Sequence, residues 1–162
     1  MIKFDSYKTE YKNPFGALKA NENVHLEFLV SKSIDVQYVN FVIRLESSHT
    51  LKMEKSGEKD GYNVFGITTA FENVGLYRYR FEIVKSDGTM LFTGTSDCHN
   101  AVIGDWLDEW YLFVYDKDFY TSDIKPDAIM YQIFPDRFFK AEGVETSGAK
   151  NERIVHDNWN DR

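Results

Sequence analysis

The residue types best suited to ligand binding stand close together in the second half of the chain, where Trp106 and Trp110 have the carboxylates of Asp105, Asp108 and Glu109 beside them. A flat aromatic ring packs against the apolar C–H face of a sugar ring, and nearby polar groups bind its hydroxyls. These residues therefore predict saccharide contact through Trp106 and Trp110. The alternative is structural: Trp110 begins an apolar run and would belong to the core, while Trp106 would cover a sheet edge. Several tyrosines are weaker candidates, because aromatic residues are common in strands for packing reasons: Tyr7, Tyr11, Tyr62, Tyr77 and Tyr79.

Charge and length exclude several classes of protein. The formal net charge is -7 and no run is rich in Lys or Arg, so the electrostatic footprint of a nucleic-acid-binding protein is absent. No stretch approaches the roughly 18 apolar residues of a membrane span, and the N-terminus lacks a signal-peptide pattern. We expect a cytoplasmic protein, or a secreted one if a signal peptide has been removed. Cys98 is the single cysteine, which excludes an intramolecular disulfide and a thiolate metal cluster, and the residues indicate no cofactor and no metal.

The elements that must position these residues are strands. Apolar and polar residues alternate with a period of two, as in half-buried strands, and Ser86-Asp87-Gly88 supplies a hairpin turn. No long segment has helical periodicity. The pattern predicts an all-β fold, an immunoglobulin-like antiparallel β-sandwich, with strands at about 24–30, 36–45, 51–53, 62–71, 76–85, 89–93 and 109–115.

A change of character near residue 128 predicts a second domain. We assign residues 1–115 to the sandwich and the polar segment 116–127, which contains Pro126, to a linker. Residues 128–134 form a nearly continuous apolar run, which suits a strand of a parallel sheet covered on both faces. Such a strand needs partners reached through crossover helices. Because too few residues follow it, we expect residues 128–162 to be the truncated start of a larger fold.

Eight contiguous residues, Tyr-Gln-Ile-Phe-Pro-Asp-Arg-Phe at 131–138, carry a resemblance to a known family. They resemble the first barrel strand of glycoside hydrolase family 13, the α-amylase family, and in particular its neopullulanase, cyclomaltodextrinase and amylopullulanase-like members. In that family a sandwich domain often precedes a (β/α)8 barrel, in the order seen here. Residues 13–17 followed by 24–30 also look like the opening of such a sandwich. The resemblance implies that residues 128–162 begin the catalytic barrel.

The resemblance implies a retaining enzyme that acts on α-glucans such as starch, pullulan or maltodextrin. Retention requires two carboxyl groups about 5 Å apart, and in the family these groups stand on later barrel strands, so no catalytic residue can be assigned in this chain. Asp136 and Arg137 match positions that support the active site at the C-terminal end of the first strand. Tyr131 is a candidate for a sugar subsite, with a core position as the alternative.

Calcium is possible in the parent enzyme because some relatives bind it through an Asn/Asp-rich loop after this strand. Here residues 141–148 lack the closely spaced oxygens that calcium prefers, which puts that site in doubt. Asp157, Asn158, Asn160 and Asp161 could supply oxygens, with a solvated tail as the alternative.

Three functions remain open at this point. The first is a non-catalytic N-terminal module that assists α-glucan binding or packs on the missing catalytic barrel. The second, also suggested by the neopullulanase-like relatives, is an assembly module that forms a homodimer and has no sugar site of its own. The third is an independent binding sandwich whose tail matches the motif by chance. The third leaves the unpaired apolar strand at 128–134 unexplained, and such a strand is an aggregation hazard.

Overall fold

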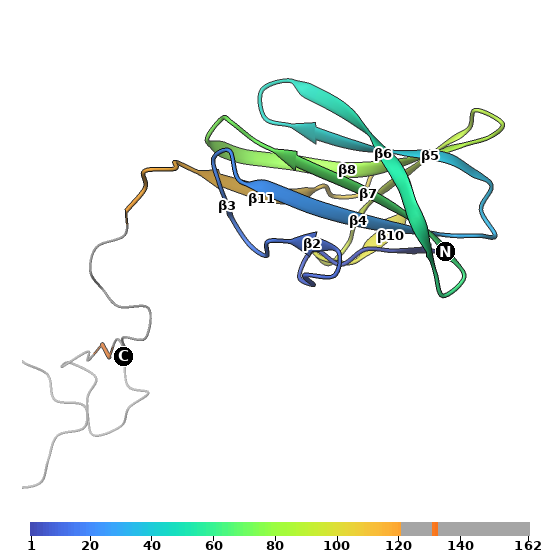
Figure 1. Ribbon diagram of the computed structural model, residues 1–162, viewed down its shortest axis with the longest axis horizontal. Coiled ribbons are helices and arrows are strands. Elements are labelled where there is room, and N and C mark those ends of the chain that lie inside the picture. Colours follow the sequence, from blue (N-terminus) through green and yellow to red (C-terminus); the bar gives the residue numbers. More distant parts are fainter. Residues whose placement is uncertain (121–130, 133–162) are drawn as a thin grey trace, which may run out of the picture. The chain divides into compact units, whose positions relative to one another are not determined.

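The structure is a computed structural model that describes residues 1–120 and 131–132. Residues Met1–Tyr120 form one compact unit, which Figure 1 shows as two layers of strands. Among the described residues there is no helix, and therefore none with the length and apolarity that a membrane crossing requires. The predicted all-β antiparallel sandwich is confirmed; its immunoglobulin-like subtype stays a prediction.

The described part of the chain contains eleven strands: β1 Ile2–Lys3, β2 Lys12–Asn13, β3 Leu18–Lys19, β4 Asn23–Ser31, β5 Val36–Arg44, β6 Ser48–Lys59, β7 Tyr62–Ala70, β8 Gly75–Lys85, β9 Met90–Thr95, β10 Ala101–Ile103 and β11 Trp110–Tyr115. In β4, β8 and β11 the side chains on one face are buried at every second position, as period-two alternation predicts. Tyr77, Tyr79, Phe81 and Ile83 of β8 all face the core, while Arg78 between them is exposed.

Hydrogen bonding joins the strands in the order β1-β4-β7-β6-β5-β8-β11-β3, with β2 on β4 and β9 between β8 and β10. All pairs are antiparallel except β11 with β3, which is parallel. The long β6 belongs to both layers, because Ser48 to Met53 pair with β5 while Glu54 to Lys59 pair with β7. In Figure 1 this strand crosses from one layer to the other.

The predicted strands are found, with one marked difference in extent and four further short strands. The hairpin at Ser86-Asp87-Gly88 is confirmed, since β8 and β9 pair on either side of it and the Gly88 N–H donates to the Lys85 carbonyl at 2.9 Å. The strand predicted at 51–53 is instead the twelve-residue β6. Its alternation is hidden because each half is bonded on one side only and most of its side chains are exposed. Four short strands, β1, β2, β3 and β10, have too few residues to show a period.

Candidate functional site

The outer surface of the β5–β8–β11 layer carries an exposed row of apolar side chains. Tyr111 and Phe113 of β11 are 56 % and 51 % exposed, since they alternate with the buried Trp110, Leu112 and Val114. Strand register sets their neighbours on the same face: Phe113 lies opposite Leu76 and Tyr111 opposite Arg78 on β8, and Phe92 of β9 lies opposite Glu82. We call the four exposed side chains Leu76, Phe92, Tyr111 and Phe113 the aromatic face.

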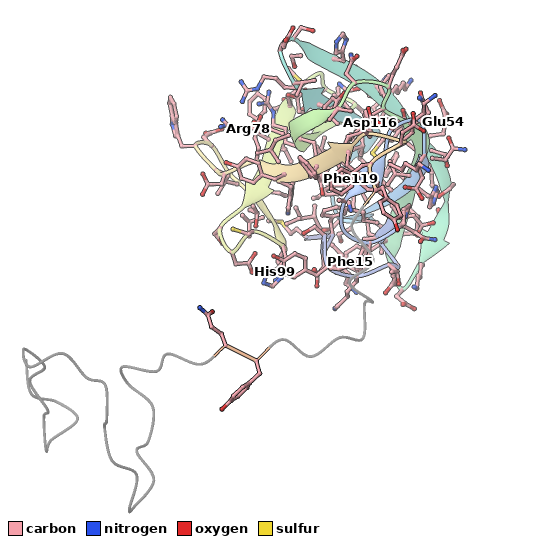
Figure 2. All side chains as sticks on the ribbon, turned by 90° about the vertical axis from the view of Figure 1, so that its left-hand side faces the viewer. Phe15, Glu54, Arg78, His99, Asp116 and Phe119 are labelled. Atoms are coloured by element: carbon pink, nitrogen blue, oxygen red, sulfur yellow. The ribbon has the colours of Figure 1, made fainter. Side chains whose placement is uncertain are left out.

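Arginines hold the aromatic face in place. The Arg78 guanidinium lies 5.6 Å from the centre of the Tyr111 ring, and that of Arg80 lies 5.7 Å from the centre of the Phe92 ring. Both distances are within the range of a cation–π contact. Figure 2 labels Arg78 at the surface of the sandwich.

The same arginines organise the carboxylates of this face. Arg80 donates to Glu82 Oε1 at 2.8 Å and to Glu109 Oε1 at 3.1 Å, and Arg44 donates to Glu109 Oε2 at 2.7 Å. The surface therefore combines flat rings with fixed donors and acceptors on rigid strands. Such a combination suits the stacking of a sugar ring together with hydrogen bonds to its hydroxyls.

Trp106 stands in the loop between β10 and β11 and is fully exposed. Its φ of 62° lies in the left-handed region, which non-glycine residues seldom adopt. The loop is fastened to β9 at both ends, by Gly104 N–H to the Phe92 carbonyl at 3.1 Å and by Thr95 N–H to the Asp108 carbonyl at 2.9 Å. The exposure leaves both faces of the indole open to a ligand, and Asp105 and Asp108 beside it are exposed too.

Trp110, the second tryptophan candidate, lies in the core instead. It is 1 % exposed, stacks on Tyr79 at 5.6 Å between ring centres, and donates its Nε1–H to the His99 carbonyl at 3.0 Å. No face of the ring is open, which agrees with the core alternative for Trp110 rather than with sugar contact. Of the tyrosines, Tyr11, Tyr77 and Tyr79 are also buried.

A second exposed group of rings lies near the N-terminus. Tyr7 stacks on His99 with ring centres 5.0 Å apart, and Phe15 meets Tyr7 edge-on at 6.1 Å. Phe15 and His99 lie on one side of the sandwich in the end-on view of Figure 2. The loop that carries Phe15 is held by the buried Lys12, whose Nζ donates to the Gly16 carbonyl at 2.6 Å; burial lowers the pKa of this ammonium.

Most of the remaining candidate residues lie outside the part of the chain that the structure describes; Tyr131 is the exception. Tyr131 is described and is 75 % exposed, outside any strand. Asp136, Arg137, the doubtful calcium loop at 141–148 and the tail around Asp157, Asn158, Asn160 and Asp161 lie outside the described residues. Within 1–120 and 131–132 no group of three or more His, Cys, Asp or Glu is placed to hold a metal ion.

The pattern of tryptophans and carboxylates does not point to Tyr111 and Phe113, but the apolarity of their strand does. The run Trp-Tyr-Leu-Phe-Val-Tyr at 110–115 is apolar on both faces, whereas a half-buried strand is expected to be polar on its outer face. An apolar outer face without a covering element points to a contact surface.

Comparison with known proteins finds relatives that match nearly the whole of this chain. No protein-family model matches the chain. Proteins named amylopullulanase from Thermoanaerobacterium thermosulfurigenes and Thermoanaerobacterium saccharolyticum are each 32 % identical over 99 % of this chain, and one from Thermoanaerobacter thermohydrosulfuricus is 27 % identical over 98 % of it. This chain is a homologue of one segment of the amylopullulanases. The resemblance seen at 131–138 is thereby confirmed and extends over nearly the whole chain.

The homologous segment is a small part of each relative. The chain spans 9 %, 13 % and 12 % of the three amylopullulanases. Among solved structures, the type III pullulan hydrolase from Thermococcus kodakarensis is similar over 67 % of this chain and 17 % of that chain, with 16 % identity and a TM-score of 0.42. A likeness of that size adds nothing to the assignment.

Proposed function

We propose that residues 1–120 form a non-catalytic module that binds α-glucan for a retaining glycoside hydrolase of the amylopullulanase kind. The observation that carries the proposal is the aromatic face, where Tyr111 and Phe113 are half exposed on a rigid strand beside Arg78. Sugar rings have one apolar surface, their C–H face, and stack on rings that are held open in this way. The amylopullulanase homologues supply the class of ligand.

The carboxylates on this face suit binding rather than hydrolysis. Glu82 and Glu109 both accept hydrogen bonds from Arg80, and Glu109 also accepts one from Arg44. These contacts hold both carboxylates as fixed acceptors beside the exposed rings. On the resemblance alone, catalysis belongs to a following barrel, with Asp136 and Arg137 as supports of its active site.

A second candidate function is assembly, either with a second copy of the chain or with the catalytic barrel. It is favoured by the exposed aliphatic residues Leu76 and Met90, which are 54 % and 48 % exposed. A flexible aliphatic side chain contributes little to the stacking of a sugar, but it is well used in the apolar centre of a protein interface.

Tryptophan fluorescence tests the proposed function on the 162-residue protein. Adding maltohexaose is expected to give a saturable change in emission, because Trp106 is exposed and its loop is bonded through Gly104 to the carbonyl of Phe92, a residue of the aromatic face. The variant Trp106→Phe is expected to lose that change, and a reducing-sugar assay on the same samples is expected to show no turnover. Turnover would contradict the non-catalytic role. A dimeric mass in sedimentation together with no response to sugar would favour the assembly module instead.

A further inference from the structure

A pocket opens where two strands of the sandwich separate. β6 and β7 pair from Glu54–Gly66 to Lys59–Tyr62, but beyond that point Ser48 to Met53 pair with β5 alone and Ile67 to Ala70 with β4 alone. The two strands diverge as a fork, and a pocket of about 630 Å³ lies in it. This volume is within the range of about 300–1,000 Å³ that is typical of small-molecule sites.

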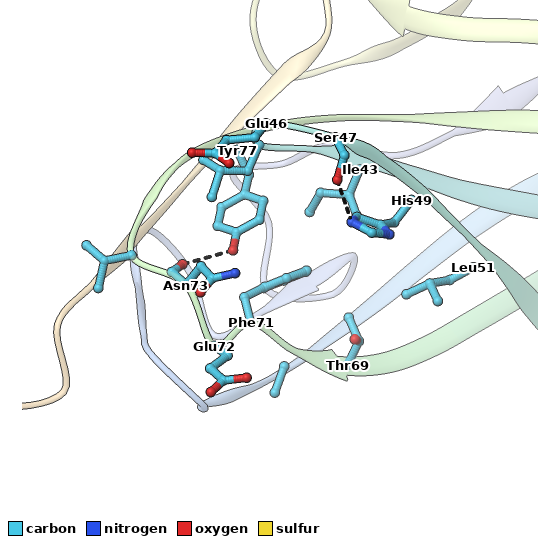
Figure 3. Close-up of a pocket in the computed structure, with 13 residues that line it drawn as sticks. Ile43, Glu46, Ser47, His49, Leu51, Thr69, Phe71, Glu72, Asn73 and Tyr77 are labelled. Atoms are coloured by element: carbon cyan, nitrogen blue, oxygen red, sulfur yellow. Dashed lines mark hydrogen bonds between the residues drawn. The ribbon is translucent and has the colours of Figure 1, made fainter.

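The floor of the pocket is aromatic and firmly held. The rings of Phe71 and Tyr77 lie with centres 5.1 Å apart and planes at 42°. The Tyr77 hydroxyl donates to the Asn73 carbonyl at 2.9 Å, which ties the floor to the segment between β7 and β8. Figure 3 shows Phe71, Asn73 and Tyr77 on one side of the pocket and Ser47, His49 and Leu51 on the other.

The rim of the pocket carries hydrogen-bond acceptors without a balancing cation. Glu46 and Glu72 line it, and neither makes an ion pair with the residues that the structure describes. Neither Lys nor Arg is among the lining residues. His49 is held by a contact of 3.0 Å between its Nε2 and the Ser47 hydroxyl. An anionic ligand is therefore disfavoured by charge repulsion, whereas a neutral ligand rich in hydroxyl donors is suited to two free carboxylates.

The pocket adjoins one end of the aromatic face. Val74 lines it and is half exposed, and Leu76 of the aromatic face follows two residues later. Phe113 is paired with Leu76 on β8. Along the chain, the rim at Val74 and the end of the aromatic face at Leu76 are therefore separated by Gly75 alone.

From the fork, its aromatic floor and its acidic rim, we propose that this pocket is a second carbohydrate subsite, which takes the end of an α-glucan chain while the aromatic face stacks units further along it. The inference rests on the proposed function for its class of ligand, and it adds a site lined by none of the residues of that face. Glu46 and Glu72 accept hydrogen bonds from the sugar hydroxyls, while the largely buried Phe71 and Tyr77 close the bottom of the pocket without offering a free ring face for stacking.

Nuclear magnetic resonance with the 162-residue protein separates the two sites. Maltotriose is expected to shift the backbone amide signals of residues 46–51 and 69–74 in addition to those of 111–113. Glu72→Ala is expected to weaken the binding that is reported by the pocket signals, residues 46–51 and 69–74, about tenfold. This loss corresponds to one hydrogen bond to a charged group. Glu54→Ala, a matched exposed glutamate on β6 outside the pocket, is expected to leave both sets unchanged.

A filling variant makes the test independent of the carboxylates. Leu51→Trp places a larger side chain at the pocket wall, and it is expected to abolish the shifts at 69–74 while those at 111–113 remain. Shifts confined to 111–113 in the unmodified protein would overturn the inference and leave the proposed function standing. Shifts confined to the pocket would support the inference and contradict the role of the aromatic face. No shift at either set would overturn both.

Discussion

Arg80 is the residue that links the charged groups of the aromatic face. Its guanidinium binds Glu82 and Glu109 and lies over the Phe92 ring. Glu82 is buried, so removing its partner leaves a carboxylate in a site with little access to water. We expect Arg80→Met to lower the free energy of unfolding by about 1–3 kcal/mol, the cost of an unsatisfied buried polar group, as measured by urea denaturation.

Arg78 provides the matched control for Arg80 on the same strand. It is exposed and its cation–π contact with Tyr111 is at the surface. Arg78→Met is therefore expected to cost less than about 1 kcal/mol. Equal costs for the two variants would show that the buried carboxylate of Glu82 does not depend on Arg80.

Asp97 organises the loop between β9 and β10. Its carboxylate accepts hydrogen bonds from the Asn100 N–H at 2.7 Å, the Asn100 side-chain amide at 2.8 Å and the His99 N–H at 3.0 Å. These donors hold the pKa of the carboxyl well below its ordinary value of 3.8. Because the pKa is lowered in the folded state, the hydrogen bonds of the ionised Asp97 carboxylate stabilise the fold at pH values above its ordinary pKa. This stabilisation is lost as the pH falls towards the folded-state pKa.

The variant Asp97→Asn isolates this contribution. It is expected to unfold more readily than the unmodified protein at pH 7, and the difference in unfolding midpoint is expected to narrow as the pH falls below about 4. Asp118→Asn is the control, since the side chain of Asp118 is exposed near the end of the described segment. A difference that stays constant from pH 7 to pH 2 would show that the ionised carboxylate is not what holds the loop.

The sequence predicts exposed residues and core residues unequally well. Trp106 was a candidate because of its carboxylate neighbours, and its exposure agrees with that role. Trp110 also follows a carboxylate residue, Glu109, but its side chain falls on the buried side of β11 and packs against Tyr79. Which of the two tryptophans is open to a ligand depends on the phase of the strand that begins at Trp110.

At the scale of elements, Gly94 lets the Trp106 loop pack on β9. A Cβ at this position would lie 2.5 Å from the Asp108 carbonyl oxygen and 2.5 Å from Leu107 Cβ. Gly94→Ala must displace the backbone of the loop, so we expect a loss of about 1–3 kcal/mol in the free energy of unfolding. We also expect a smaller fluorescence response of Trp106 to maltohexaose.

Gly57→Ala on β6 is the matched control for Gly94, because a Cβ there meets nothing within 4 Å. Gly57→Ala is expected to change the free energy of unfolding by no more than about 0.5 kcal/mol. The fluorescence response to maltohexaose is expected to stay unchanged. If Gly94→Ala behaved like this control, the loop would not depend on close packing against β9.

The long strands could be predicted because their periodicity reflects one buried face, as in β4 and β8. The sequence does not predict that β6 passes from one layer to the other. This exchange depends on a change of partner at Met53 and Glu54, and nothing in a run of mostly exposed polar residues reports which strand lies beside it. The pocket at the fork between β6 and β7 follows from that exchange and was equally hidden.

At the scale of the whole molecule, the chain corresponds to about a tenth of the length of its amylopullulanase homologues. Its described part carries the exposed aromatic face on the strands of a sandwich, with the carboxylates of that face held by arginines. In the proposed account this module holds glucan near a catalytic domain. The gain would come from raising the local concentration of substrate.

Calorimetric titration of the 162-residue protein with maltohexaose tests this account most directly. We predict saturable binding that is reduced at least about tenfold in the double variant Tyr111→Ala with Phe113→Ala, because aromatic contacts of this kind dominate binding surfaces, while circular dichroism shows the β fold retained. Binding of equal strength in the double variant, or no binding by the unmodified protein, would contradict it.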